Sequence, residues 1–245
     1  DGTAASILAT LSGVTTTGTL GVLGANRMWD NSGTVTKTFV GCCSANFTLN
    51  GTFNNLLGGV FDLKDDASSG SRTTPGTGTF NNAGTFLKSL HTTVVNDEVF
   101  NPAFNNQATG VVNINSGAIS FGGAFTQSGT LNVAAGTTLQ KSGGFTNNGN
   151  VEGSGTINVG GGTLLNNGVI RPGGGNAIGS LSIAGNLTNA AGGAIEIELL
   201  DNSSQYDKIL ATTGNVVLGG TIKVRDLIGF QTTSGDTFTI TTASA

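Results

Sequence analysis

Apolar and polar residues alternate along short segments of the chain, and the segment Gly129–Asn148 shows this clearly. Strict alternation is typical of a β-strand with one buried face. No segment carries apolar residues at the three-four spacing of a helix, so the pattern predicts short strands and excludes a helical bundle. In this segment the residues expected to face inward are Leu131, Val133, Leu139 and Phe145, and those expected to face water are Asn132 and Gln140.

A longer repeat contains these strands. A bulky apolar residue, two or three Asn-rich polar residues, a Gly and then a β-branched or apolar residue recur eight times, with starts 19 to 27 residues apart. This period predicts an all-β fold, a single-stranded right-handed parallel β-helix (β-solenoid) with about 20–27 residues per turn. The first residues of the repeats are expected to form one stack in the core, and they are Trp29, Phe53, Phe80, Phe104, Phe125, Phe145, Leu164 and Leu187.

Gly and Asn mark the corners of the repeat. Both tolerate the left-handed backbone conformation that a sharp turn between strands requires, and we take this as the reason for their position. Stacked Asn side chains are also expected to form ladders, in which each amide bonds the equivalent amide one turn above. The alternative is that these Asn residues face solvent. The candidates are Asn82, Asn105, Asn148 and Asn167.

Two alternating segments, Ile195–Leu199 and Ile222–Arg225, lie 27 residues apart, which is close to one turn. Their apolar residues are expected to face inward and their charged residues outward. Adjacent strands would then place acid opposite base, unless the charges are solvated without fixed partners. The expected pairs are Glu196 with Lys223 and Glu198 with Arg225.

The chain divides into two regions. Residues 1–28 lack the Asn corners and are expected to form an N-terminal cap, an atypical first turn or a strand region used in assembly. Residues 29–245 are expected to form the parallel β-helix, with loop insertions near 62–76 and 90–102.

The composition narrows the class of protein. Gly, Asn, Thr and Ser make up about half of the 245 residues, whereas 10% are charged and Pro occurs 3 times, which argues against a disordered linker and a collagen. A net charge of −4 gives no electrostatic reason to bind nucleic acid. No apolar run approaches the ~18 residues of a membrane helix, so we expect no membrane span.

The first insertion concentrates charge in a chain that carries little of it. Asp62, Asp65 and Asp66 are a weak calcium candidate, because carboxylate oxygens are the ligands that calcium prefers. Ordinary solvated loop charges are the alternative.

The second insertion holds His91, Asp97 and Glu98, and His91 is the single His of the chain. Together with the first insertion it would form a carboxylate cluster if the two loops lie one turn apart. No serine has a nucleophile setting, no His and thiol set suits a metal, and the glycine strings precede strands, not a helix. We therefore expect no enzymatic activity, no catalytic residues and no cofactor.

Cys42 and Cys43 are adjacent in the sequence. A bond between neighbouring cysteines is strained, and strand alternation would turn one thiol inward and the other outward. Two free thiols and an intermolecular disulfide both remain open.

The C-terminal third resembles the passenger region of bacterial autotransporters and related large surface β-helix proteins. The segments that carry the resemblance are Leu164–Leu199, Tyr206–Val224 and Gly235–Ala243. The resemblance implies the last turns of a β-helix and an extracellular or cell-surface location, and it transfers no catalytic residue. Nothing after Ala245 would form a translocating barrel, so export by self-transport is not expected.

The function that we expect is structural or adhesive. A β-helix with unpaired edge strands is suited to end-to-end contacts, which predicts a homo-oligomer, fibre or stalk subunit. The alternatives are a carbohydrate-binding module that recognises surface glycans and a polysaccharide-acting enzyme.

Overall fold

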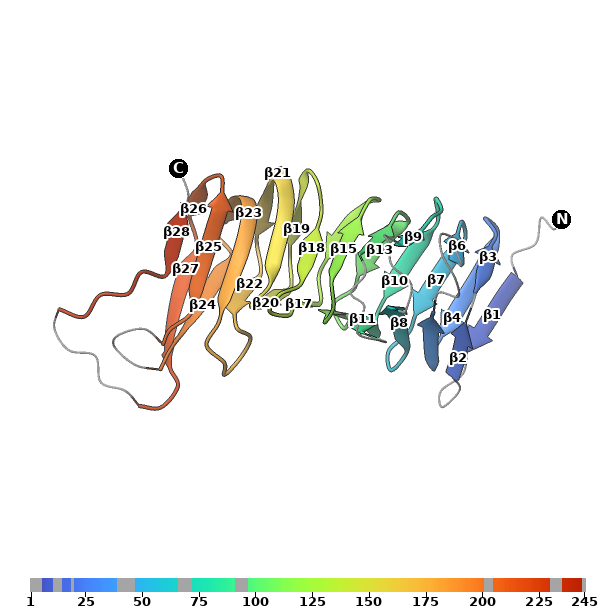
Figure 1. Cartoon of the computed structure of the whole chain (residues 1–245), viewed down its shortest axis with the longest axis horizontal. Coiled ribbons are helices and arrows are strands. Elements are labelled where there is room, and N and C mark those ends of the chain that lie inside the picture. The colour runs from blue at the N-terminus through green and yellow to red at the C-terminus, as the bar shows by residue number, and fades with distance from the viewer. Residues whose placement is uncertain are drawn as a thin grey trace. The chain divides into compact units, whose positions relative to one another are not determined.

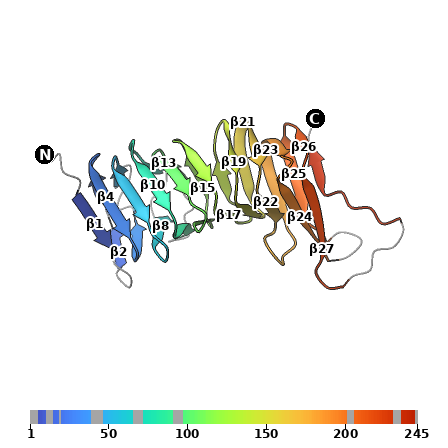
Figure 2. The same cartoon turned by 180° about the vertical axis from the view of Figure 1, so that it is seen from behind.

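The computed structural model describes residues 6–10, 15–18, 20–38, 47–65, 72–90, 97–200, 205–229 and 235–243. All the regular elements in these residues are strands, with no helix among them, and each pairing between numbered strands runs parallel (Figures 1 and 2). The prediction of an all-β parallel β-solenoid is therefore confirmed. The chain falls into two compact units, Asp1–Thr130 (unit 1) and Leu131–Ala245 (unit 2).

Unit 1 stacks its strands turn upon turn in four runs. The first run is β1 (Ser6–Thr10), β4 (Arg27–Asn31), β7 (Thr52–Asn55), β10 (Thr79–Asn82), β13 (Ala103–Asn106) and β16 (Phe125–Gln127). The second is β2 (Thr15–Gly18), β5 (Thr34–Lys37), β8 (Val60–Asp65), β11 (Thr85–Leu90) and β14 (Val111–Ile114). The third is β9 (Arg72–Thr74), β12 (Glu98–Phe100) and β15 (Ala118–Phe121), and the fourth is β3 (Gly21–Leu23) with β6 (Phe47–Leu49). Residues 1–28 thus contribute β1, β2 and β3, which pair with the following turn as the other strands do.

Unit 2 is built in the same way. One run is β20 (Asn150–Gly153), β22 (Val169–Pro172), β24 (Ala194–Leu199) and β27 (Thr221–Asp226). The long strands β21 (Thr156–Asn166) and β23 (Ser180–Asn189) pair with each other, and each pairs with two further strands. The remaining strands are β18 (Thr138–Gln140), β19 (Gly144–Asn147), β25 (Lys208–Thr213), β26 (Val216–Leu218) and β28 (Thr241–Ala243). Strand β17 (Thr130–Val133) begins at the last residue of unit 1 and continues into unit 2.

The first residues of the repeats lie one above another inside each unit. In unit 1 the register places Trp29, Phe53, Phe80, Phe104 and Phe125 on successive strands. In unit 2 Phe145, Leu164 and Leu187 follow each other in the same way. All eight are buried, because inward positions of a solenoid face the neighbouring turns and not water.

Aromatic rings fill the core of unit 1. The rings of Phe53 and Phe80 stack with centroids 4.8 Å apart, and those of Phe80 and Phe104 stack at 5.3 Å. A second stack, of Phe61 on Phe86 at 5.8 Å, meets the first edge to face. Offset stacking and edge contacts are the arrangements that aromatic quadrupoles favour, so parallel turns place these rings where they attract one another.

Two ladders of amides follow the corners, and they bond in opposite directions. In the buried inner ladder each amide donates to the next turn, from Asn55 to Asn82 at 2.8 Å and from Asn82 to Asn106 at 2.9 Å. In the outer ladder each amide donates to the preceding turn, from Asn81 to Asn54 and from Asn105 to Asn81, both at 2.9 Å. The expected ladders therefore exist, with Asn82 and Asn105 in different ones.

The reason that we gave for Asn at the corners is wrong. Among the described residues, the non-glycine residue with a positive φ is Asn176, at 79°, and it belongs to no ladder. Asn147 and Asn166 of unit 2 are fully buried, and the side-chain amide of Asn147 donates a hydrogen bond of 2.7 Å to Oδ1 of Asn166. Asn is thus placed at these corners by its side-chain hydrogen bonds, not by its backbone freedom.

Candidate functional site

Charged side chains line the outward face of β20, β22, β24 and β27 in unit 2. The register sets Glu152 beside Arg171 and Glu196 beside Lys223. These outward positions face one another because the side-chain period of a strand is two and the strands are in register. The sequence-based pairing of Glu196 with Lys223 is present, as an ion pair of 3.2 Å.

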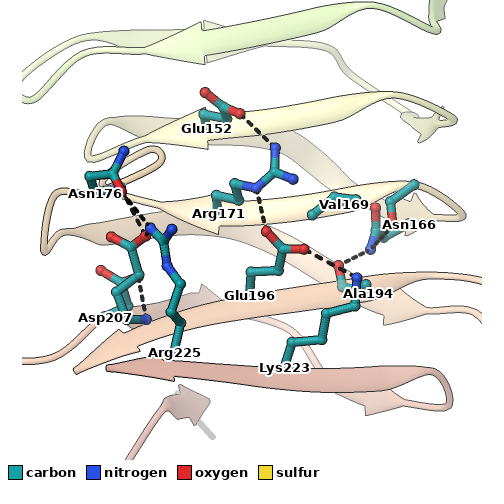
Figure 3. A network of polar contacts seen from close by, with 12 residues as sticks. Glu152, Asn166, Val169, Arg171, Asn176, Ala194, Glu196, Asp207, Lys223 and Arg225 are labelled. Carbon is teal, nitrogen blue, oxygen red and sulfur yellow. Dashed lines mark hydrogen bonds and ion pairs between the residues drawn. The ribbon is translucent and has the colours of Figure 1, made fainter. Parts of the chain in front are cut away.

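The charges alternate in sign along this face (Figure 3). Arg171 lies between two carboxylates, with Nη1 3.0 Å from Glu152 and Nε 2.5 Å from Glu196. The hydrogen bond from Arg171 lowers the pKa of Glu196, against a smaller opposing effect of burial, and the bond from Lys223 adds to the lowering. The same bond raises the pKa of Arg171.

Glu198 and Arg225 form the second expected pair, and a loop completes it. Arg225 donates to Glu198 and to Oδ1 of Asn176, which lies 2.9 Å away. Asn176 in turn donates its backbone N–H to Oε1 of Glu198 at 2.8 Å. The loop between β22 and β23 therefore covers Glu198, whose side chain is only 6% exposed although it stands on the outward face.

Asp207 is fully buried behind Glu198. Its two oxygens accept backbone N–H bonds from Gly179 and from Glu198, each at 2.8 Å. Burial raises the pKa of Asp207 to about 6, and the negative charge of Glu198 adds to the rise, while the two backbone bonds oppose it. The alternation of the sequence did not indicate this residue, because Asp207 lies before β25 and its carboxylate accepts backbone hydrogen bonds from other segments of the chain.

These side chains surround a groove of about 500 Å³. Its lining combines donors and acceptors: the lining residues are Arg171, Gly175, Glu196, Glu198, Lys223, Val224 and Arg225. Within the described part of the chain, Oε2 of Glu198 is buried without a hydrogen-bond partner. An unpartnered buried carboxylate oxygen is costly, so this atom marks a place where a ligand donor would be favourable.

The two inward residues expected of β27 are not covered. Ile222 lies beside the buried Ile195 and Val224 beside the buried Ile197, yet Ile222 is 37% and Val224 61% exposed. No further strand pairs with β27 in the described residues. The register was predicted correctly, but the expected burial of these two side chains is wrong, because no further turn among the described residues packs on them.

The calcium candidate remains a prediction. Asp62 lies in β8, where it accepts a hydrogen bond of 2.7 Å from Ser89. Asp65 ends the same strand, and Asp66 lies outside the described residues. In the part of the chain that is described, no three His, Cys, Asp or Glu side chains group to hold a metal ion.

The second insertion contains a strand that the sequence did not indicate. Glu98 begins β12 and is buried, and its Oε1 lies 2.8 Å from Nζ of the fully buried Lys37 and accepts a bond of 2.6 Å from the Thr74 hydroxyl. Asp97 accepts a bond from the N–H of Ala118. His91, Cys42 and Cys43 lie outside the described residues.

Comparisons with known proteins give no relative: no family model, no curated protein and no solved structure matches the chain. The described residues also contain no helix long and apolar enough to cross a membrane.

Proposed function

We propose that the protein is a non-enzymatic structural or adhesive β-solenoid that assembles end to end. In this assembly the edge formed by β26 and β27 receives the β1 and β2 edge of a second copy. The observation that carries the proposal is the open edge of unit 2, where apolar side chains face water. They are Val217, Leu218, Ile222 and Val224.

The preceding strand indicates what such an edge lacks. Ile195 and Ile197 on β24 are 2% and 0% exposed, and β27 repeats their pattern one turn later with Ile222 and Val224. A further turn stacked on β27 would bury these side chains in the same way. Unpaired strand edges are templates for strands of another chain, and the gain comes from backbone hydrogen bonds together with apolar burial.

A second copy is the partner that fits this edge. β1 and β2 are parallel strands of the same solenoid, each paired on one side only among the described residues. A head-to-tail contact between such edges is heterologous, and it generates a filament when successive copies do not close into a ring.

Electron microscopy and sedimentation velocity over a range of protein concentrations test the assembly. We expect uniform filaments or concentration-dependent oligomers from the unaltered chain, and discrete particles from the double variant Val217→Lys/Val224→Lys, because charge on an edge strand opposes pairing. Leu57→Lys is the matched control, since Leu57 is 74% exposed at a turn between β7 and β8 and should leave assembly unchanged. Discrete particles from the unaltered chain at every concentration would contradict the proposal.

We also propose an extracellular or cell-surface location and kinship with autotransporter passengers. Support comes from the sequence resemblance of Leu164–Leu199 and Tyr206–Val224, which form the turns of unit 2 from β21 to β27. Protease treatment of intact source cells, followed by immunoblotting, tests the location. Loss of the signal from intact cells supports it, and protection until the cells are lysed would contradict it.

A further inference from the structure

We propose that the charged groove of unit 2 binds a neutral saccharide through a pair of adjacent hydroxyl groups. The site comprises Glu198 as acceptor, Lys223 and Arg225 as donors, and the glycine-rich loop at Gly175 as its wall. The inference concerns the outward face of β24 and β27, and Val224 is the lining residue that the groove shares with the edge proposed for assembly.

The size and exposure of the groove suit a ligand of this kind. Its volume of about 500 Å³ lies in the range of small-molecule sites, which span roughly 300–1,000 Å³. Lys223 and Arg225 are 58% and 53% exposed, so a ligand can reach their side chains. Figure 3 shows Lys223 extending toward Glu196 and Arg225 extending toward Asn176.

The groups that line the groove favour a ligand group that both donates and accepts hydrogen bonds. Oε2 of Glu198 is a buried acceptor without a partner in the described residues, and it requires a donor. The Lys223 ammonium carries three N–H donors, and its bond to Glu196 uses one of them. A hydroxyl group donates one hydrogen bond and accepts others, so two adjacent hydroxyls satisfy the carboxylate and the cation together.

Charge balance disfavours an ionic ligand. The groove is lined by three cations and two carboxylates, and each cation is already within ion-pair distance of a carboxylate. The cations are Arg171, Lys223 and Arg225, and the carboxylates are those of Glu196 and Glu198. Negative charge is added by Glu152, which pairs with Arg171, and by Asp207, which accepts a bond from the N–H of Glu198. An anion would meet these carboxylates and a cation would meet the three basic groups, whereas a polyol avoids both repulsions.

The unpartnered oxygen of Glu198 reaches a ligand only if the carboxylate rotates. Its Oε1 is held by Asn176 and Arg225. The terminal torsion of a Glu side chain is broad, so the carboxylate that lines the groove can turn Oε2 toward it, and the same rotation moves Oε1 away from these two donors.

The proposal is tested by titrating the chain with neutral oligosaccharides. Isothermal titration calorimetry measures the binding, and amide chemical shifts locate it. The probes are cellohexaose, xylohexaose, maltohexaose and mannohexaose, with an oligogalacturonate and a chitosan oligomer as charged comparators. We expect saturable binding of at least one neutral probe, with shifts at Gly175, Lys223 and Arg225. Binding of a charged comparator alone, or of none of the six, would overturn the proposal.

Variants identify the residues. Glu198→Gln and Lys223→Ala should each weaken binding by about tenfold, the value expected for one lost hydrogen bond to a charged group. Lys223→Ala removes a half-exposed side chain and keeps the proposal testable if Glu198→Gln does not fold. Lys141→Ala, which alters a cation of unit 2 outside the groove, is the control and should bind as the unaltered chain does. Equal binding by Lys223→Ala and the unaltered chain would contradict the assignment.

Discussion

At the scale of single residues, close contact between turns leaves no room for a side chain at some corner positions of the repeat. A Cβ atom on Gly193 would lie 2.2 Å from the carbonyl oxygen of Asn166 in the turn before it. On the neighbouring Gly192 a Cβ atom would meet no atom within 4 Å. One corner glycine is therefore required by the spacing of the turns, and the next is tolerant.

This contrast gives a prediction for two adjacent substitutions. Gly193→Ala should lower the free energy of unfolding by about 1–3 kcal/mol, because the methyl group forces the turns apart, whereas Gly192→Ala should change it by less than about 0.5 kcal/mol. Thermal and urea unfolding of both variants provide the measurement. Equal stability of the two variants would show that the turns are not spaced as described.

Asp207 predicts a pH dependence of stability. Its pKa is raised from 3.8 to about 6 in the folded protein, so the folded state binds the proton more tightly than the unfolded chain. Its unfavourable contribution is thus fully present above pH 6 and is relieved as the pH falls toward 4. The lowered pKa of Glu196 acts in the opposite sense, since its stabilisation is lost below its ordinary pKa of 4.5.

Asp207→Asn removes this titration. The melting temperature of the unaltered protein should rise relative to that of Asp207→Asn as the pH is lowered from 7 to 5, and the two profiles should be parallel above pH 7. Melting curves recorded at half-unit pH intervals provide the comparison. Parallel profiles over the whole range from pH 7 to 5 would contradict the raised pKa.

At the scale of elements, side chains as well as backbones bond along the axis of each unit. Asn166 accepts from Asn147 and donates to Asn189, both at 2.7 Å, and it also donates to the carbonyl of Ala194 at 3.0 Å. Its neighbour Asn167 is exposed and donates one bond of 3.2 Å to Asn148. The inner ladder therefore joins successive turns in the core, whereas water competes for the hydrogen bonds of the exposed outer ladder.

Removal of the two amides should have unequal effects. We expect Asn166→Ala to lower the free energy of unfolding by about 2–4 kcal/mol, because it leaves buried hydrogen-bond partners unsatisfied. Asn167→Ala should lower it by less than about 1 kcal/mol. Chemical denaturation measures both. Similar losses for the two variants would count against the distinction between an inner and an outer ladder.

The Lys37 and Glu98 pair joins strands β5 and β12 inside unit 1. Lys37→Met should cost about 3–5 kcal/mol because it leaves a buried carboxylate without its cation, whereas the double variant Lys37→Met/Glu98→Leu should recover much of that loss. A double-mutant cycle by urea unfolding measures the coupling. A double variant as unstable as the sum of the single variants would contradict the burial of this pair.

At the scale of the whole molecule, periodicity predicted the solenoid, the register and the core stack. The alternation of two and the repeat of about twenty residues were enough to set Phe80 on Phe104 and Glu196 on Lys223, since register follows from the pattern of burial. The repeat does not predict the buried pair of Lys37 and Glu98, the burial of Asp207 or the division into two units. These features depend on contacts between segments that lie at no regular spacing in the sequence.

Disulfide trapping tests the central claim, the in-register stacking of turns, most directly. In a Cys42→Ser/Cys43→Ser background, Asn81→Cys with Asn105→Cys should cross-link on oxidation, because these positions are register partners on adjacent strands roughly 4.8 Å apart. Asn81→Cys with Thr126→Cys, two turns apart, should remain reduced because its Cα separation of about 10 Å exceeds the reach of a disulfide. Cross-linking of the second pair without the first would contradict the stacked solenoid.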